Sequence, residues 1–240
     1  GLHIGLIGAM IFKFLRQMKF SIITSCAISS FLIVSYGILT GMSGSSMRAM
    51  IMLLVAYFAK VIGRSYDLLS AMSLAALIAL IIAPLSFLDA GFLLSFGAVI
   101  GIGGVYPVLA SFLPESKGFK GYILNALMLS AGINLVISPV IAYFYYELPL
   151  WSIFYNLIVV PLMSLLVPSA MAGLILTYFD FDLSYIAFLP SRLILSLNKR
   201  LCLLNDALPK ASFVTGKPDI ILLVLYYISI ALILCLICKC

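Results

Sequence analysis

Few side chains in this sequence could do chemistry. The 240 residues include one histidine, His3, and eight acidic residues. One imidazole cannot supply a histidine-rich metal site, which excludes most zinc hydrolase chemistry. A G-x-x-x-x-G-K-[ST] loop, which would cradle nucleotide phosphates, does not occur. The sequence therefore predicts no catalytic residue, metal ion or cofactor in this chain.

Three cations stand where a polyanion could meet the chain. Sixteen positions separate Arg48 from Arg64, which amounts to roughly 24 Å of α-helix. The two residues are therefore expected near opposite ends of one membrane span, with Lys60 beside the second. One interpretation is ordinary interfacial anchoring, because a cation at the bilayer centre costs about 2.5 to 3.5 kcal/mol. The other is a positive mouth at each end of a path for a polyanion.

Polar side chains recur at a spacing of four residues in two apolar segments. This spacing places each trio on one face of a helix. Such stripes hold helices together in a membrane or line an aqueous path, and both interpretations remain open here. The trios are Ser21, Ser25 and Ser29, and Ser130, Asn134 and Ser138.

Two apolar segments are interrupted by proline. Trp151–Tyr178 is too long for one straight span and contains Pro161, with Asn156 about one turn before it. Pro139 interrupts another segment just after Asn134. Because proline removes a backbone hydrogen bond, kinked or broken helices are predicted. These arise where freed backbone faces protein or a water-filled cavity, so they indicate either a translocation path or packing kinks.

The elements that position these residues must lie in lipid. Hydrophobic residues make up 65% of the chain and charged residues 9%, and the mean hydropathy is +1.26. These values exclude a water-soluble enzyme. The uncharged runs approach or exceed the 20 or so residues that span a bilayer and lack strand alternation. They predict an all-α, polytopic helical bundle with about seven to eight membrane segments. The expected segments are 2–14 (truncated), 21–40, 47–62, 68–84, 91–113, 121–146, 151–178 and 220–238, with 183–205 as a helix in the membrane interface.

The basic residues orient the bundle. The cluster formed by Lys13, Arg16 and Lys19 places the first loop in the cytoplasm by the positive-inside rule. Alternation then places Lys60 and Arg64 inside and Asp89 outside. Further along, Lys117 and Lys120 are expected inside and Glu147 outside. This rule explains much of the net charge of +6 without a need for nucleic acid.

Several short blocks resemble the motifs of one family. Gly1-Leu2-His3 resembles the end of an S-G-L-H motif, and Arg48-Ala49 followed by Met52 resembles R-A-x-x-M. Gly63-Arg64 followed by Asp67 resembles G-R-x-x-D, and Asn156-Leu157 followed by Pro161 resembles N-L-x-x-x-P. The segment 89–96 resembles a D-x-G-F-Q-L-S-F signature with Leu93 in place of Gln. Its other matching residues are Asp89, Gly91, Phe92, Leu94, Ser95 and Phe96.

Together these blocks resemble the competence domain of ComEC proteins, the inner-membrane DNA-uptake channels of natural transformation. The resemblance implies that residues 1–240 form a single transmembrane domain that passes one DNA strand into the cytoplasm. It also implies a bacterial plasma membrane, a DNA receptor and an ATP-driven translocase as partners, beside single-stranded DNA and the bilayer. Oligonucleotide-binding and metallo-β-lactamase-like domains commonly accompany this domain. Since the sequence contains neither, we expect a fragment of a longer chain, without enzymatic activity.

A mechanism follows as a hypothesis. Arg48 would attract the strand outside, and Arg64 and Lys60 would receive it inside. Gly91, Gly97 and Gly101 would allow close approach of neighbouring helices or DNA. Four aromatic residues could stack bases or pack in the core: Phe92, Phe96, Tyr106 and Tyr145.

Two other classes remain as alternatives. A secondary transporter for a small anionic metabolite would also use broken helices and a few cations. An intramembrane enzyme would need His3 and Asp89 to meet in one buried cleft.

Overall fold

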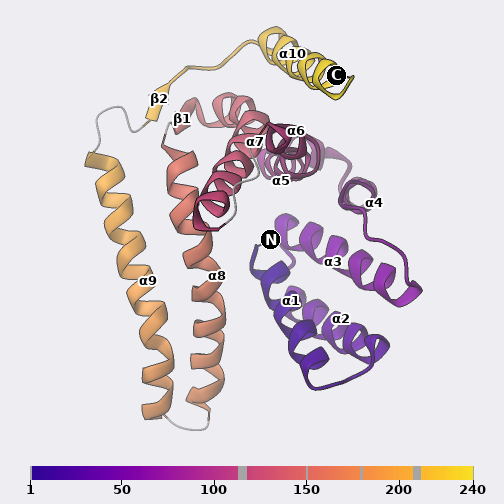
Figure 1. Cartoon of the computed structure of the whole chain (residues 1–240), viewed down its shortest axis with the longest axis vertical. Helices are drawn as coiled ribbons and strands as arrows, with labels where there is room; N and C mark the ends of the chain where they lie inside the picture. Colours follow the sequence, from indigo (N-terminus) through magenta and orange to yellow (C-terminus); the bar gives the residue numbers. More distant parts are fainter. Residues whose placement is uncertain (1, 113–117, 150, 179–180, 208–211, 240) are drawn as a thin grey trace. The chain divides into compact units, whose positions relative to one another are not determined.

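The computed structural model describes residues 2–112, 118–149, 151–178, 181–207 and 212–239. These residues are almost entirely helical, as Figure 1 shows, and the prediction of an all-α polytopic bundle is confirmed. The first helices are α1 (Leu2–Gln17), α2 (Ile22–Leu39), α3 (Gly44–Ile62), α4 (Leu68–Ile82) and α5 (Ala90–Ile100). They are followed by α6 (Tyr106–Ser111), α7 (Phe119–Tyr145), α8 (Ser152–Thr177), α9 (Phe181–Ala207) and α10 (Ile220–Lys239). Shorter elements are a 3-10 turn η1 (Pro84–Leu88), a π-helical turn η2 (Gly101–Val105), and strands β1 (Glu147–Pro149) and β2 (Ser212–Val214).

Six of the described helical stretches are long and apolar enough to cross a membrane. They are Ile22–Leu39, Gly44–Ile62, Ala90–Ser111, Lys120–Tyr145, Ser152–Thr177 and Ile220–Ile237. Helix α4 is apolar but has 15 residues, and α1 has 16. At about 1.5 Å per residue, both are shorter than the bilayer core. The charged helix α9 contains the segment expected in the interface. The lower end of the predicted seven to eight segments is therefore reached only if α4 or α1 inserts as a short helix.

The described chain divides into two compact units. The first comprises Gly1–Phe92 and Ser164–Ser191, and the second comprises Leu93–Met163 and Arg192–Cys240. Each unit has its own packing.

The first unit contains a three-helix bundle formed by α1, α2 and α3. Its core includes Ile4, Ile33 and Tyr57, each no more than 3% exposed. Ser25 and Ser29 are fully buried on the inner face of α2, which confirms that these two residues share one helix face. Ser21 has a different function, because its hydroxyl accepts a hydrogen bond from Thr24 N at 3.1 Å and caps the start of α2.

A helical hairpin completes the first unit. The end of α8 lies beside the start of α9 (Figure 1), and the Ser169 and Ser191 hydroxyls hydrogen bond at 2.6 Å. The Phe188 ring packs on Gly173, where a side chain would collide with it. Small residues thus allow the two helices to approach closely.

In the second unit, α5 and η2 cross α7 at two glycines. A Cβ atom at Gly101 would lie 2.7 Å from Ile133 Cα, closer than packed atoms approach. One at Gly132 would lie 3.3 Å from Tyr106 N. Gly97 of α5 faces Val136 and Ile137 of α7. Gly97 and Gly101 therefore serve helix packing, and neither leaves space for DNA.

The proline-interrupted segments each remain one helix. Helix α7 continues through Pro139, and α8 continues through Pro161, so neither separates into two half-helices. Because proline has no N–H, Pro139 cannot donate the helical hydrogen bond to the carbonyl four residues earlier. That carbonyl belongs to Leu135. The Tyr226 hydroxyl of α10 donates to that carbonyl at 2.9 Å. The bond from Tyr226 thus replaces the helical hydrogen bond that Pro139 cannot make, and the Leu135 carbonyl faces protein.

A small antiparallel sheet joins the segments that flank α8 and α9. Glu147 of β1 pairs with Val214 of β2, and Pro149 pairs with Ser212. The Thr215 amide also donates to the Tyr146 carbonyl at 3.0 Å. The sheet ties the end of α7 to the segment that leads into α10.

Candidate functional site

Two of the sequence motifs meet at Arg48. The Arg48 guanidinium donates to the Gly91 carbonyl at 2.8 Å and lies 5.7 Å from the centre of the Phe92 ring. Asp89 adds an attractive charge. The R-A-x-x-M motif at the start of α3 therefore holds the start of the D-x-G-F segment at α5.

The position of Arg48 favours one of its two interpretations over the other. Its side chain is only 7% exposed, because it lies over Phe92 and against the backbone of Gly91. A buried guanidinium bound to the protein does not form an open positive mouth. Its observed contacts are those of a residue that joins two helices.

The G-R-x-x-D motif forms the turn between α3 and α4. Gly63 ends α3 in the left-handed region at φ 74°, where glycine carries no steric penalty. Asp67 caps α4, and its carboxylate accepts a hydrogen bond from Ser70 N at 2.9 Å. The Ser70 hydroxyl and amide hydrogen bonds lower the pKa of the Asp67 carboxyl. This motif is explained by helix capping.

Five exposed cations gather at one end of the α1–α3 bundle, here called the basic end. Lys60 Nζ lies 4.1 Å from the centre of the Phe12 ring, which brings the last turn of α3 beside the end of α1. Arg16 donates to the Phe20 carbonyl at 2.6 Å. The positive-inside rule predicts that this end faces the cytoplasm. The basic end consists of Lys13, Arg16, Lys19, Lys60 and Arg64.

A polar network joins α7 to the first turns of α8. Asn134 Nδ2 donates to the Ser130 carbonyl at 2.9 Å, and the Ser152 hydroxyl donates to Asn134 Oδ1 at 3.0 Å. Asn156 Nδ2 lies 3.4 Å from Ser130 Oγ, and Ser138 Oγ donates to the Asn134 carbonyl at 2.6 Å. The predicted stripe of Ser130, Asn134 and Ser138 therefore lies on one helix face. Ser130 and Asn134 hold α7 to α8, whereas the Ser138 hydrogen bond lies within α7.

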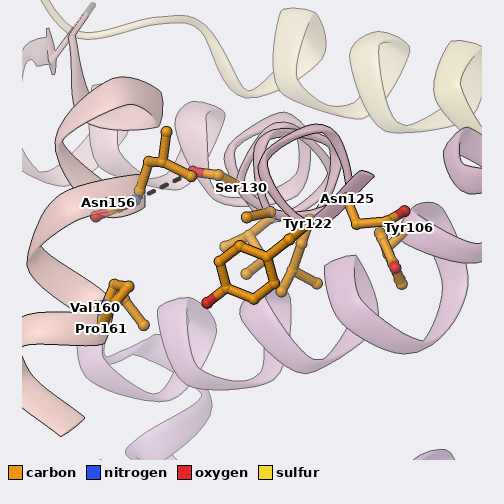
Figure 2. Close-up of a pocket in the computed structure, with 11 residues that line it drawn as sticks. Tyr106, Tyr122, Asn125, Ser130, Asn156, Val160 and Pro161 are labelled. Atoms are coloured by element: carbon orange, nitrogen blue, oxygen red, sulfur yellow. Dashed lines mark hydrogen bonds between the residues drawn. The ribbon is translucent and has the colours of Figure 1, made fainter. Parts of the chain in front are cut away.

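Beside this network lies a pocket of about 390 Å³, here called the α7–α8 pocket. Figure 2 shows Asn156, Val160 and Pro161 projecting from α8 on one side and Tyr106 and Asn125 on the opposite side. The other lining side chains come mainly from α7. They include Tyr122 and Ser130 together with aliphatic residues. None of the eleven lining residues carries a charge.

The four aromatic candidates for base stacking separate into three groups. Phe92 and Phe96 are each 8% exposed, which favours core packing for both. Tyr145 is 59% exposed at the end of α7. Only Tyr106 lines the pocket.

Two polar pocket residues were missed from the sequence, Tyr122 and Asn125. A signal for Tyr122 was present, because it lies eight residues before Ser130 and continues the same four-residue spacing. Asn125 lies one helical step to the side of that stripe. Because apolar residues surround both positions, the polar stripe was not extended to them from the sequence.

The residues of the intramembrane-enzyme alternative do not meet. His3 and Asp89 are both exposed, and no contact joins them in the described part of the chain. Gly1, which begins the S-G-L-H-like block, and Lys117 lie outside the described residues. Ser95 is half-buried on α5, and Gly91 is exposed where its carbonyl accepts the Arg48 bond.

These features define a polytopic α-helical membrane protein whose polar side chains are grouped at helix contacts and at one basic end. The family model described as Competence protein matches residues 1–239, so the chain belongs to the competence protein family. Membership assigns the chain a role in DNA uptake during competence. No curated protein and no solved structure matches the chain. The family match includes no nuclease or other catalytic domain.

Proposed function

We propose that this chain forms the membrane channel that conducts single-stranded DNA into the cytoplasm of a bacterium during natural transformation. The observation that carries this proposal is the extent of the family match. It covers residues 1–239, and these residues contain six stretches long enough to span a membrane. The part of the protein that belongs to a DNA-uptake family is thus the part embedded in lipid.

The proposal requires a polar path with cations where the strand leaves it. A single strand carries one charge per nucleotide and cannot cross hydrocarbon unaided. The basic end supplies five exposed cations on the side where the strand would leave. We assign the receiving function to Lys60 and Arg64 within this larger cluster. Arg48 acts instead by positioning the start of α5.

The alternative, a secondary transporter for a small anion, receives less support. Such a site needs a cation or aligned helix dipoles beside the bound anion. The α7–α8 pocket has no charged lining residue. The cations of the basic end are exposed and spread over the ends of two helices, an arrangement suited to an extended polyanion.

The remaining partners follow from the same proposal. Transport into the cytoplasm requires energy, and the sequence lacks a nucleotide-binding loop. An ATP-driven translocase on the cytoplasmic side and a DNA receptor on the outer side would complete the pathway in the bacterial inner membrane.

The test is DNA internalisation in a naturally transformable host that carries Lys60→Gln with Arg64→Gln. We expect internalised DNA to fall several-fold at unchanged membrane abundance, because two receiving charges are removed. The matched control is Lys199→Gln with Arg200→Gln, which removes two exposed cations of α9. Equal internalisation by both double variants at equal abundance would refute a receiving function for the basic end.

A further inference from the structure

The α7–α8 pocket has polar groups whose bonding capacity is unused. Asn125 makes no side-chain hydrogen bond within the described part of the chain. Asn156 makes one, the 3.4 Å contact with Ser130. An amide in a membrane-spanning helix is costly without partners. The pocket therefore suits a guest that brings hydrogen-bond donors and acceptors.

The rest of the lining restricts what that guest can be. Tyr106 and Tyr122 present aromatic rings, and Leu157, Val160 and Pro161 present apolar surface. No lining residue is charged, so neither a phosphate nor a carboxylate finds a counter-ion there. A neutral, flat group with apolar faces and a polar edge fits this combination.

The helix crossing explains why the pocket lies where it does. The π-helical turn η2 ends directly before Tyr106, and Gly132 allows the Tyr106 backbone to lie against α7. Across the pocket, Pro161 cannot donate to the Leu157 carbonyl, and both residues line the wall. π-helical turns occur frequently at functional sites, and a carbonyl freed by proline at membrane depth is tolerated where it is buried in protein or lines a cavity.

We propose that the α7–α8 pocket binds one unpaired nucleobase of the strand in transit, a step that rests on the proposed DNA-conducting function. Tyr122 and Tyr106 offer ring faces for stacking, and the Asn125 and Asn156 amides, which lie on opposite sides of the pocket, meet opposite edges of the base. Because an amide both donates and accepts, the site accepts any base. The phosphates remain outside the pocket. A duplex is excluded, since its base edges are already paired.

The test compares oligonucleotides that differ only in their bases. The full chain in lipid nanodiscs is titrated with a fluorescent oligothymidylate, with an abasic oligonucleotide of equal length and with a duplex. We expect the oligothymidylate to bind about tenfold more tightly than the abasic strand, the effect of stacking one base. Equal affinity for the abasic strand overturns the nucleobase pocket while leaving the conducting function intact. No binding of either single strand overturns both.

Tyr122 and Tyr145 supply a matched pair of variants. Both lie on α7, with 61% and 59% of the side chain exposed, so truncation removes little core packing at either position. Tyr122→Leu is expected to abolish the preference over the abasic strand, whereas Tyr122→Phe and Tyr145→Leu retain it. Asn156→Leu should reduce the preference and lower Tm slightly, because it also removes the 3.4 Å contact with Ser130 that joins α8 to α7. If a phospholipid acyl chain fills the pocket instead, Tyr122→Leu leaves oligothymidylate binding unchanged, and the proposal is wrong.

Discussion

Arg48 shows how one residue can be both charged and buried in a membrane helix. A guanidinium without partners is costly in a hydrocarbon environment. Here it donates to the Gly91 carbonyl and covers the Phe92 ring, while Asp89 supplies the opposite charge. The guanidinium thereby connects α3 with the start of α5, which are 43 positions apart at these two residues.

Replacement of Arg48 by Gln should destabilise the protein. The change removes a charge-assisted hydrogen bond to a backbone carbonyl, which contributes about 1.5 to 3 kcal/mol. We expect a lower Tm in detergent and less protein in the membrane. Arg64→Gln, at an exposed position, is the control and should leave Tm unchanged. An Arg48→Gln protein as stable as the Arg64→Gln protein would show that the Gly91 bond does not hold α5.

Asp67 makes the α3–α4 turn sensitive to acid. The pKa of its carboxyl is lowered by the hydrogen bonds from Ser70. A carboxyl whose folded-state pKa lies below its unfolded value of about 3.9 stabilises the fold above that value. This stabilisation is lost as the pH falls through the folded pKa.

Asp67→Asn is the variant that isolates this effect, because asparagine also caps helices but does not titrate. Below about pH 4, the wild-type protein should lose thermal stability faster than the Asn variant. The measurement is Tm against pH for both proteins. Parallel curves would mean that the Asp67 charge contributes nothing to the cap.

At the scale of elements, proline in α7 creates a docking point for α10. No residue in the apolar window of α10 is buried, so packing alone holds this helix weakly. Its Tyr226 and Tyr227 hydroxyls donate to the Leu135 and Val136 carbonyls at 2.9 and 2.8 Å. Only the Leu135 carbonyl loses its helical partner to Pro139.

This arrangement predicts a coupling between Tyr226 and Pro139. Tyr226→Phe should cost about 0.5 to 1.5 kcal/mol and increase hydrogen exchange in α10. In a Pro139→Ala background the cost should become smaller, because the alanine amide introduced there can donate to the Leu135 carbonyl. Tyr227→Phe is the matched control, whose cost should not depend on residue 139. Additive effects of Tyr226→Phe and Pro139→Ala would contradict the coupling.

Substitution of Gly101 and of Gly104 tests whether the glycines of η2 are needed for close contact with α7 or only for backbone flexibility. A Cβ atom at Gly101 would lie 2.7 Å from Ile133 Cα, whereas at Gly104 the nearest atom, Ile100 Cγ2, is 4.0 Å away. Gly101→Ala should lower stability by about 1 to 3 kcal/mol, and Gly104→Ala should have little effect. Thermal unfolding in detergent measures both. Equal tolerance of the two changes would show that α7 is not held against η2.

At the scale of the whole molecule, the sequence predicts helices better than it predicts their partners. Gaps between charges place the helices close to their observed bounds, because lipid demands long uncharged runs. The meeting of Arg48 with Gly91 could not be predicted, since spacing along the chain does not reveal distance in space. The contact of Asn134 with α8 agrees with one of the two interpretations that the four-residue spacing left open, but the pocket that Tyr122 and Asn125 line was not expected. Its residues come from three separate helices.

The central claim is that this membrane domain conducts single-stranded DNA. The most direct measurement is entry of fluorescent single-stranded DNA into liposomes that contain the full chain, scored as protection from an external nuclease. A strand gradient drives entry without a motor. Protection of single strands, with duplex DNA of equal length left digested, is the predicted result. If single strands are fully digested while a small radiolabelled anion accumulates inside the same liposomes, the chain is a transporter of small anions and the account is wrong.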